Sequence, residues 1–231
     1  MTLRSRSHQT EYLDTETLSD AEYAAVLADL SAVNTVTLAR APTLAFLRRV
    51  TRGLQPGARF RVLDVGFGEG DMLRRIHRWG RRRGLALELT GIDLNPGCAA
   101  AARAATPGAM GIDYRTGDLF DVPPGEYDVV ISSLFTHHLS DEQVVTFLRW
   151  MEASTAVGWF VNDLHRHTIA YHGFRALAAV ARWNPIVRAD GAISVTRSFR
   201  RRDWVALLDA AGIPARIAWH LPFRYGVSRI K

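Results

Sequence analysis

Three glycines at alternate positions directly follow an apolar run of the sequence. In order, the end of the run and its exit contain Asp64, Val65, Gly66, Phe67, Gly68, Glu69 and Gly70. Glycine lets the backbone turn sharply and approach a ligand closely, and a helix that starts just afterwards offers free N–H groups. The segment therefore predicts a loop that binds a nucleotide-type ligand.

The spacing of these glycines bears on the kind of ligand. A dinucleotide-binding loop has the pattern G-x-G-x-x-G, which would require a third glycine at position 71. The chain has Asp71 there. With Asp64 and Glu69, this residue makes the loop acidic, which suits a cationic ligand better than a pyrophosphate. A nicotinamide-dependent oxidoreductase is therefore a less favoured alternative.

Carboxylates also follow the next two predicted strands. Asp93, with Leu94 after it, ends one strand, and Asp118 and Leu119 follow the next. At such a strand end an acidic side chain can accept hydrogen bonds from both ribose hydroxyls of an adenosine ligand. Asp93 could instead cap the helix that follows it. Asp118 could bond the adenine amino group, with Leu119 against the ring.

Four histidines lie near the ends of two further predicted strands: His137, His138, His165 and His167. Imidazole titrates near neutral pH, so it suits acid–base catalysis. The four residues lack the helical spacing typical of metal-binding histidine pairs, and we expect no metal. A packing or capping role is the alternative for each single histidine. We take His137, His138 and His165 as the candidate bases.

The pattern around these residues is typical of a parallel α/β fold. Short β-branched runs predict strands at 60–65, 87–93, 112–116, 127–133, 159–163, 215–220 and 223–230. Amphipathic segments predict helices near 71–82, 97–106, 141–153, 168–182 and 201–211. Two more helices, beginning near 19 and 42, have no strand between them. We therefore expect an arm and a helical lid over 1–56 and a ligand-binding domain over 57–231.

The composition limits the class of protein. Of the 231 residues, 48% are hydrophobic and 23% charged, which excludes a collagen-like, disordered or coiled-coil chain. Cys98 is the single cysteine, so a disulfide framework and a zinc site built from several cysteines are excluded. The N-terminus has no apolar core of the signal-peptide type, and no uninterrupted apolar run reaches about 18 residues. We expect a soluble, cytoplasmic protein without a membrane span.

The net charge of +6 comes almost entirely from arginine, since Lys231 is the only lysine. The densest group lies on the helix predicted at 71–82 and its exit, opposite an apolar face: Arg74, Arg75, Arg78, Arg81, Arg82 and Arg83. Such a group is usually the solvated face of a helix. Binding to nucleic acid is therefore not expected.

Together, the glycine loop, Asp93, Asp118 and the strand at 127–133 resemble the class I S-adenosylmethionine-dependent methyltransferases in order and spacing. The resemblance covers residues 60–231 and implies a Rossmann-like sheet of seven mostly parallel strands in the order 3-2-1-4-5-7-6. Strand 7 would be antiparallel, with helices on both faces. The resemblance also implies which residues bind S-adenosylmethionine: Asp64, Gly66, Phe67, Gly68, Asp93, Leu94, Asp118, Leu119 and Ser133.

Two segments indicate a branch of this family. The stretches 132–140 and 161–167 resemble methyltransferases that act on quinones or on aromatic and polyketide-derived small molecules. We therefore expect transfer to a phenolic oxygen of such a metabolite, in secondary metabolism. C-methylation of a quinol or polyketide ring is the main alternative, and RNA methylation or a catalytically inactive binding partner are others. Arg166 could hold an acidic group of the acceptor or pair with Asp163 or another carboxylate.

Overall fold

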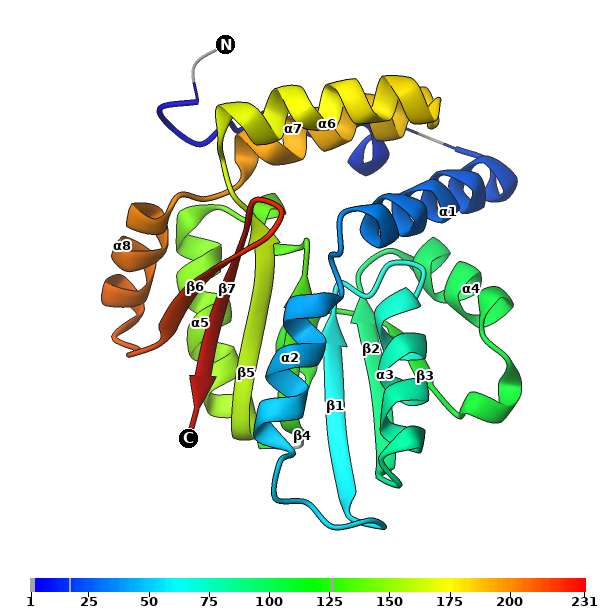
Figure 1. Cartoon of the computed structure of the whole chain (residues 1–231), viewed down its shortest axis with the longest axis vertical. Coiled ribbons are helices and arrows are strands. Elements are labelled where there is room, and N and C mark those ends of the chain that lie inside the picture. The colour runs from blue at the N-terminus through cyan, green and yellow to red at the C-terminus, as the bar shows by residue number, and fades with distance from the viewer. Residues whose placement is uncertain (1–2, 17, 126) are drawn as a thin grey trace.

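A computed structural model describes residues 3–16, 18–125 and 127–231 of the chain (Figure 1). Its centre is one seven-stranded sheet in the order β3-β2-β1-β4-β5-β7-β6. The strands are β1 (Arg59–Val65), β2 (Ala86–Asp93), β3 (Asp113–Thr116), β4 (Tyr127–Ser133), β5 (Thr155–Leu164), β6 (Arg216–His220) and β7 (Arg224–Ile230). Strand β7 runs antiparallel to both of its neighbours, and the other pairs are parallel. The predicted α/β class and strand order are confirmed.

Eight α-helices are described around this sheet. They are α1 (Asp20–Val36), α2 (Ala41–Val50), α3 (Asp71–Arg82), α4 (Pro96–Ala105), α5 (Asp141–Ser154), α6 (Thr168–Ala181), α7 (Pro185–Arg197) and α8 (Arg201–Ala211). Four 3-10 turns accompany them: η1 (Tyr12–Asp14), η2 (Gly108–Met110), η3 (Leu119–Asp121) and η4 (Thr136–His138). None of the described helices is long and apolar enough to cross a membrane.

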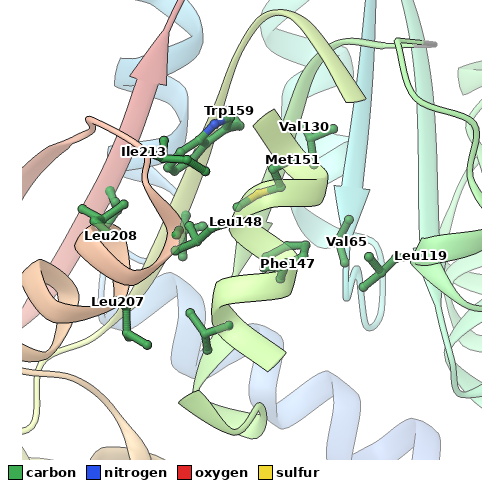
Figure 2. Packing of buried hydrophobic residues seen from close by; sticks show 14 of the residues in the cluster. Val65, Leu119, Val130, Phe147, Leu148, Met151, Trp159, Leu207, Leu208 and Ile213 are labelled. Carbon is green, nitrogen blue, oxygen red and sulfur yellow. The ribbon is translucent and has the colours of Figure 1, made fainter. Parts of the chain in front are cut away.

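The hydrophobic core lies on both faces of the sheet. On one face, α5 and α8 lie next to each other against the sheet, and the α5 residues Phe147, Leu148 and Met151 are fully buried (Figure 2). On the other face, α2, α3 and α4 cover the strands and bury residues such as Leu47 and Leu73. The periodic apolar residues of each helix are therefore what fixes its position against the sheet.

The segment before β1 differs in part from the predicted lid. Helix α2 packs against β5 and β7 and shares the core with β1, so it belongs to the layered domain. Helix α1 instead lies with α6 and α7 across the carboxyl ends of the parallel strands (Figure 1). A small apolar cluster of Val26, Ala178, Trp183 and Val187 joins these three helices. The upper layer is thus built from segments far apart in the sequence.

Helix α7 was missed in the sequence because its middle contains Gly191 and its apolar pattern is weak. The structure explains the glycine: a Cβ atom at this position would lie 2.1 Å from the ring of Phe174 on α6. Asn184 caps the helix by accepting a hydrogen bond from the Ile186 N–H at 2.9 Å. Close packing of α6 and α7 therefore requires a residue that weakens the sequence signal of a helix.

The prediction that the arginines of α3 form a solvent-exposed face is wrong for Arg74. Its side chain is buried and contacts the Glu69 carbonyl oxygen, while the other five arginines of the group are exposed. Arg74 also approaches the Glu69 carboxylate, at 3.4 Å. It therefore ties the end of the glycine loop to α3, and the prediction of a solvated face holds only for its neighbours.

Candidate functional site

A cavity of about 430 Å³ lies between the carboxyl ends of the central strands and the helical layer above them. Ligands of open parallel sheets bind at this edge, outside the strand ends. The structure brings several of the predicted site residues to the wall of this cavity: Asp64, Gly66, Phe67, Gly68, Ser133, His137, His138 and His165. They come from the β1–α3 loop, the end of β4, η4 and the end of β5.

The glycine loop is fixed by the end of the neighbouring strand. The Gly68 N–H donates to Asp93 Oδ2 at 3.1 Å, and the Asn95 N–H donates to the other oxygen at 3.0 Å. Gly68 has a φ of +56°, and a Cβ atom there would meet nothing within 4 Å. The loop therefore leaves open space beside its backbone, as a loop that holds a ligand must.

Four of the predicted cofactor residues do not line the cavity. Asp93 lies behind the loop and does not cap α4, because Asn95 has that role. Leu94 is 68% exposed, and Asp118 accepts a hydrogen bond from the Phe120 N–H at 2.9 Å. Leu119 is buried near Val65 in the core (Figure 2). Contacts of these four residues with the cofactor stay predictions.

Asp64 lies beneath the loop and is almost fully buried. Burial raises the pKa of its carboxyl group well above the usual range, and the nearby Asp71 and Asp93 raise it further. Asp71 itself forms an ion pair with Arg40, which follows α1. Ser133, at the end of β4, has its hydroxyl oxygen 3.3 Å from that of Thr43 on α2. Polar side chains from β1, from the start of α3 and from the end of β4 therefore lie near the glycine loop.

A buried imidazole–carboxylate pair joins η4 to β5. His137 Nδ1 lies 2.7 Å from Asp163 Oδ1, and the His137 backbone N–H donates to Asp163 Oδ2 at 3.0 Å. Thr136 also donates to this carboxylate. Burial alone would raise the pKa of Asp163, but His137 and these hydrogen bonds outweigh burial and lower it to about 2. Asp163 is therefore an ionised anchor for the His137 ring.

The N-terminal arm supplies two carboxylates to the same place. Glu11 Oε1 lies 3.6 Å from His137 Nε2, and Glu11 Oε2 lies 3.8 Å from His138 Nε2. Asp14 Oδ2 lies 3.1 Å from His138 Nδ1. The Ser194 hydroxyl donates to Glu11 at 2.8 Å. Burial raises the pKa of Glu11 to about 7, although His138 opposes the shift.

Sequence reasoning missed Glu11 and Asp14. They lie in a polar stretch without apolar periodicity, so no local pattern indicates a fold for it. The arm is held by side chains from distant segments: Arg6 pairs with Asp141, and the Ser7 N–H donates to the Thr196 carbonyl oxygen at 3.0 Å. Long-range contacts of this kind leave no signal in a single sequence.

His165 and His167 form a second pair, beside the β6–β7 turn. The ring of His165 lies 4.8 Å from that of Tyr225, and the ring of His167 lies 5.1 Å from that of Phe223. Burial lowers the pKa of His165 to about 4, and the neighbouring His167, Arg200 and Arg166 lower it further. His167 caps α6 by accepting a hydrogen bond from the Ile169 N–H at 3.1 Å.

Two buried arginines flank the strand ends. Arg166 forms an ion pair with Asp203 at 2.8 Å and donates to the Leu3 carbonyl oxygen, so the ion-pair alternative describes it. Arg224 lines the cavity with 2% of its surface exposed, and its Nη2 donates to Thr37 Oγ1 at 2.8 Å. Its Nε and Nη1 atoms have no hydrogen-bond partner among the described residues. Arg224 was not singled out in the sequence.

Comparison with known proteins agrees with this geometry. Residues 62–158 match the family model described as a methyltransferase domain. This segment contains the glycine loop, both predicted acidic strand ends and the two histidines of η4. The chain therefore contains an S-adenosylmethionine-dependent methyltransferase domain. No curated protein sequence matches the methyltransferase.

Solved structures similar to this methyltransferase share its fold over nearly the whole chain. A SAM-dependent methyltransferase from Aquifex aeolicus has 16% identity and a TM-score of 0.62, covering 93% of this chain and 99% of its own. The plantazolicin methyltransferase BpumL has 12% identity and a TM-score of 0.69, with 95% and 92% covered. Magnesium protoporphyrin IX methyltransferase from Synechocystis PCC 6803 has 15% identity and a TM-score of 0.57, with 94% and 89% covered.

The residues present fit S-adenosylmethionine. Gly68 leaves room at the loop that a Cβ atom would fill, and the first N–H groups of α3 lie directly after it. The carboxyl groups of Asp64, Glu69 and Asp71 also line this end of the cavity and offer acceptor oxygens to the ammonium group of the ligand, although Arg40 and Arg74 pair with Asp71 and Glu69. The residues at this end of the cavity are therefore compatible with binding of S-adenosylmethionine.

Proposed function

We propose that this methyltransferase acts on a phenolic oxygen of a small aromatic or polyketide-type metabolite. The observation that carries the proposal is the cavity itself. The glycine loop, where the methyl donor would bind, and the cluster of Glu11, His137 and His138 share its wall, so the donor and the acceptor would meet in one cavity. An acceptor of this class would place the enzyme in secondary metabolism.

The lining favours a flat apolar acceptor. Away from the loop, the wall consists mainly of apolar side chains from the helical layer, the end of β4 and the β6–β7 turn: Leu27, Val33, Leu134, Ile169, Phe174, Leu177 and Phe223. Sites of this kind bind small molecules through apolar contact and use a few polar groups for orientation. An aromatic ring with few polar substituents matches that surface better than a nucleotide base on a charged chain.

Arg224 supports an acceptor with a negative oxygen. Its guanidinium group is buried in the wall and two of its nitrogen atoms have no hydrogen-bond partner among the described residues, so its positive charge would attract an anionic oxygen of a ligand in the cavity. A buried cation is stabilised strongly by such a partner. A phenolate, an enolate or a carboxylate substituent on the acceptor would each supply one.

The methyl group itself comes from the cofactor. When bound, S-adenosylmethionine supplies an electrophilic methyl group: a new oxygen–carbon bond forms, the carbon–sulfur bond breaks, and S-adenosylhomocysteine and the methyl ether remain. The chain's own residues align the acceptor, exclude water and take up its proton. Alignment in an enclosed cavity is the main requirement of such a displacement.

The acceptor proton needs a destination, because a phenol has a pKa of about 10. The cluster of Glu11, His137 and His138 is better suited than His165. With its pKa near 4, His165 binds a proton too weakly to compete for one on a phenol at neutral pH. His137 and His138 each have Nδ1 directed to a carboxylate, so Nε2 is the nitrogen left for the acceptor.

The proposal is tested by incubating the full chain with labelled S-adenosylmethionine and a panel of phenols, quinols and RNA. We expect label in a phenol, and NMR of the product should show the methyl group on oxygen. A methyl group on ring carbon would support C-methylation instead. Label in RNA alone would overturn the proposal. The His172→Ala variant, changed at an exposed residue of α6, should behave like the unmodified enzyme.

A further inference from the structure

We propose that Glu11, His137 and His138 form a binding site for one divalent transition-metal ion in the wall of the cavity. One carboxylate oxygen and one nitrogen of each imidazole all lie within 4.8 Å of one another. Zinc bonds to nitrogen and carboxylate oxygen are about 2.0–2.2 Å long. Two ligand atoms on one such ion lie at most about 4.4 Å apart. Glu11 Oε1 lies 3.6 Å from His137 Nε2, and its other oxygen, Oε2, lies 3.8 Å from His138 Nε2, so a small closure of the three side chains would complete the site.

The outer contacts of both imidazoles are those of metal ligands. A ligating histidine almost always donates its second ring N–H to a carboxylate or carbonyl, which orients the ring. Here Asp163 lies 2.7 Å from Nδ1 of His137, and Asp14 lies 3.1 Å from Nδ1 of His138. With Nδ1 of each ring next to a carboxylate, Nε2 is the atom that would bind the metal, and it lies 3.6 Å from Glu11 in His137 and 3.8 Å from Glu11 in His138.

This arrangement leaves Glu11 facing two electron-pair donors. Its side chain is 8% exposed, and the Ser194 hydroxyl is its hydrogen-bond donor among the described residues. Arg197, the nearest cation on α7, donates to the carbonyl oxygens of His137 and His138 and not to the carboxylate. A cation between the three side chains would compensate the negative charge that Glu11, Asp14 and Asp163 bring together. A proton shared between Glu11 and an imidazole is the competing explanation.

The ligand types indicate which metals fit. Two imidazole nitrogens with one carboxylate suit Zn²⁺, Co²⁺, Ni²⁺ or Fe²⁺, whereas Mg²⁺ and Ca²⁺ prefer oxygen ligands throughout. Three protein ligands also leave at least one coordination position free, and all three residues line the cavity. The site is therefore open toward the space where an acceptor would bind.

A role for the metal rests on the proposed function. A metal ion lowers the pKa of an oxygen ligand, as it does for water. A phenol whose oxygen joins the ion would release its proton to water and stay bound as phenolate, next to the loop that holds the methyl donor. In the metal-free protein an imidazole would take that proton instead.

Metal binding can be measured without methyl transfer. The full chain is stripped with a chelator, titrated with Co²⁺ while its visible absorption is recorded, and then titrated with Zn²⁺ as a competitor. We expect one equivalent of Co²⁺ per chain, displaced by Zn²⁺. Glu11→Gln and His138→Gln should each abolish the signal, and Asp14→Asn should weaken Co²⁺ binding about 10-fold to 100-fold. His172→Ala should bind as the unmodified protein does.

Two results would overturn the site. One is a folded, stripped protein that takes up no Co²⁺ or Zn²⁺, which would favour the shared proton. The other is binding that survives His138→Gln but is lost in His165→Ala, which would move the metal to the second histidine pair. His138 is partly exposed, so His138→Gln keeps the test valid if Glu11→Gln does not fold. Metal binding without transfer to any phenol would support the site and count against the proposed function alone.

Discussion

His137 Nδ1 lies 2.7 Å from Asp163 Oδ1, and both side chains are buried at the point where η4 meets the end of β5. Asp163 faces donors on every side: the ring and backbone N–H groups of His137, the Thr136 hydroxyl and the Leu164 N–H. A single carboxylate thus fixes both the position and the proton of the imidazole at the cavity wall. Any change to it acts on fold and site together.

The first prediction concerns this carboxylate. In Asp163→Asn, one amide N–H₂ group replaces an acceptor oxygen and points at groups that are themselves donors. We expect the free energy of unfolding to fall by about 3 kcal/mol, because buried donors lose their charged acceptor. Urea unfolding measures the change. Asp209→Asn on α8, where the residue is exposed, is the matched control and should change stability by less than about 0.5 kcal/mol. Equal stability of both variants would contradict the assigned network.

The glycine loop and the strand ends were predictable because their signals are local. A buried strand, three close glycines and an immediate helix are recorded in adjacent residues, and the parallel sheet then brings the ends of β1, β4 and β5 to one edge. Side chains such as Ser133 and His137 reach the cavity for this reason alone. Strand order itself came from the resemblance of these motifs to a family, not from periodicity.

The rest of the site depends on contacts that no local pattern records. Glu11 reaches the histidines because Arg6, Ser7 and Tyr12 bind groups on α5 and α7, more than 130 residues away in the sequence. Arg224 lies in a predicted strand without any local sign of a functional role, but it is buried against Thr37, which follows α1. Packing, not propensity, decides both positions.

The second prediction separates two glycines of the loop. Gly68→Ala should lower stability by only about 1–2 kcal/mol, the cost of a left-handed conformation, since its Cβ atom meets nothing within 4 Å. In Gly70→Ala the Cβ atom would lie 2.5 Å from the Tyr114 hydroxyl oxygen, so we expect a larger loss. Calorimetry should show that Gly68→Ala folds but binds S-adenosylmethionine poorly. Normal affinity in this variant would mean that the open space does not hold the cofactor.

The third prediction follows from the lowered pKa of His165. In the folded protein the group titrates near 4, against an ordinary value of 6.5. Between these values the unfolded chain binds a proton that the folded protein does not, so stability falls as the pH drops from 6.5 toward 4. The polar and titratable groups that face His165 are His167, Arg166, Arg200, Trp219 and Tyr225.

Urea unfolding at pH 7.5 and pH 5 tests this sign. The unmodified protein should lose more stability between the two pH values than His165→Gln, which has no titrating group there. His172→Gln should keep the full pH dependence, because its side chain is exposed on α6. If His165→Gln loses as much stability between the two pH values as the unmodified protein, the surroundings of His165 do not lower its pKa. The argument that His165 is too weak a base for the acceptor would then fail.

The last prediction tests Asp93, which is held behind the glycine loop and not on the cavity wall. Its two oxygens accept hydrogen bonds from Gly68 and Asn95, and each oxygen has a second lone pair for a ribose hydroxyl. Asp93→Ala removes the support of the loop and that acceptor at once. We expect affinity for S-adenosylmethionine to fall by about 1–3 kcal/mol in calorimetry. Asp113→Ala, at an exposed ion pair with Arg115, should bind normally. Should Asp93→Ala fold and bind as tightly as this control, the acidic end of β2 would serve the loop alone, and the ribose would need another partner.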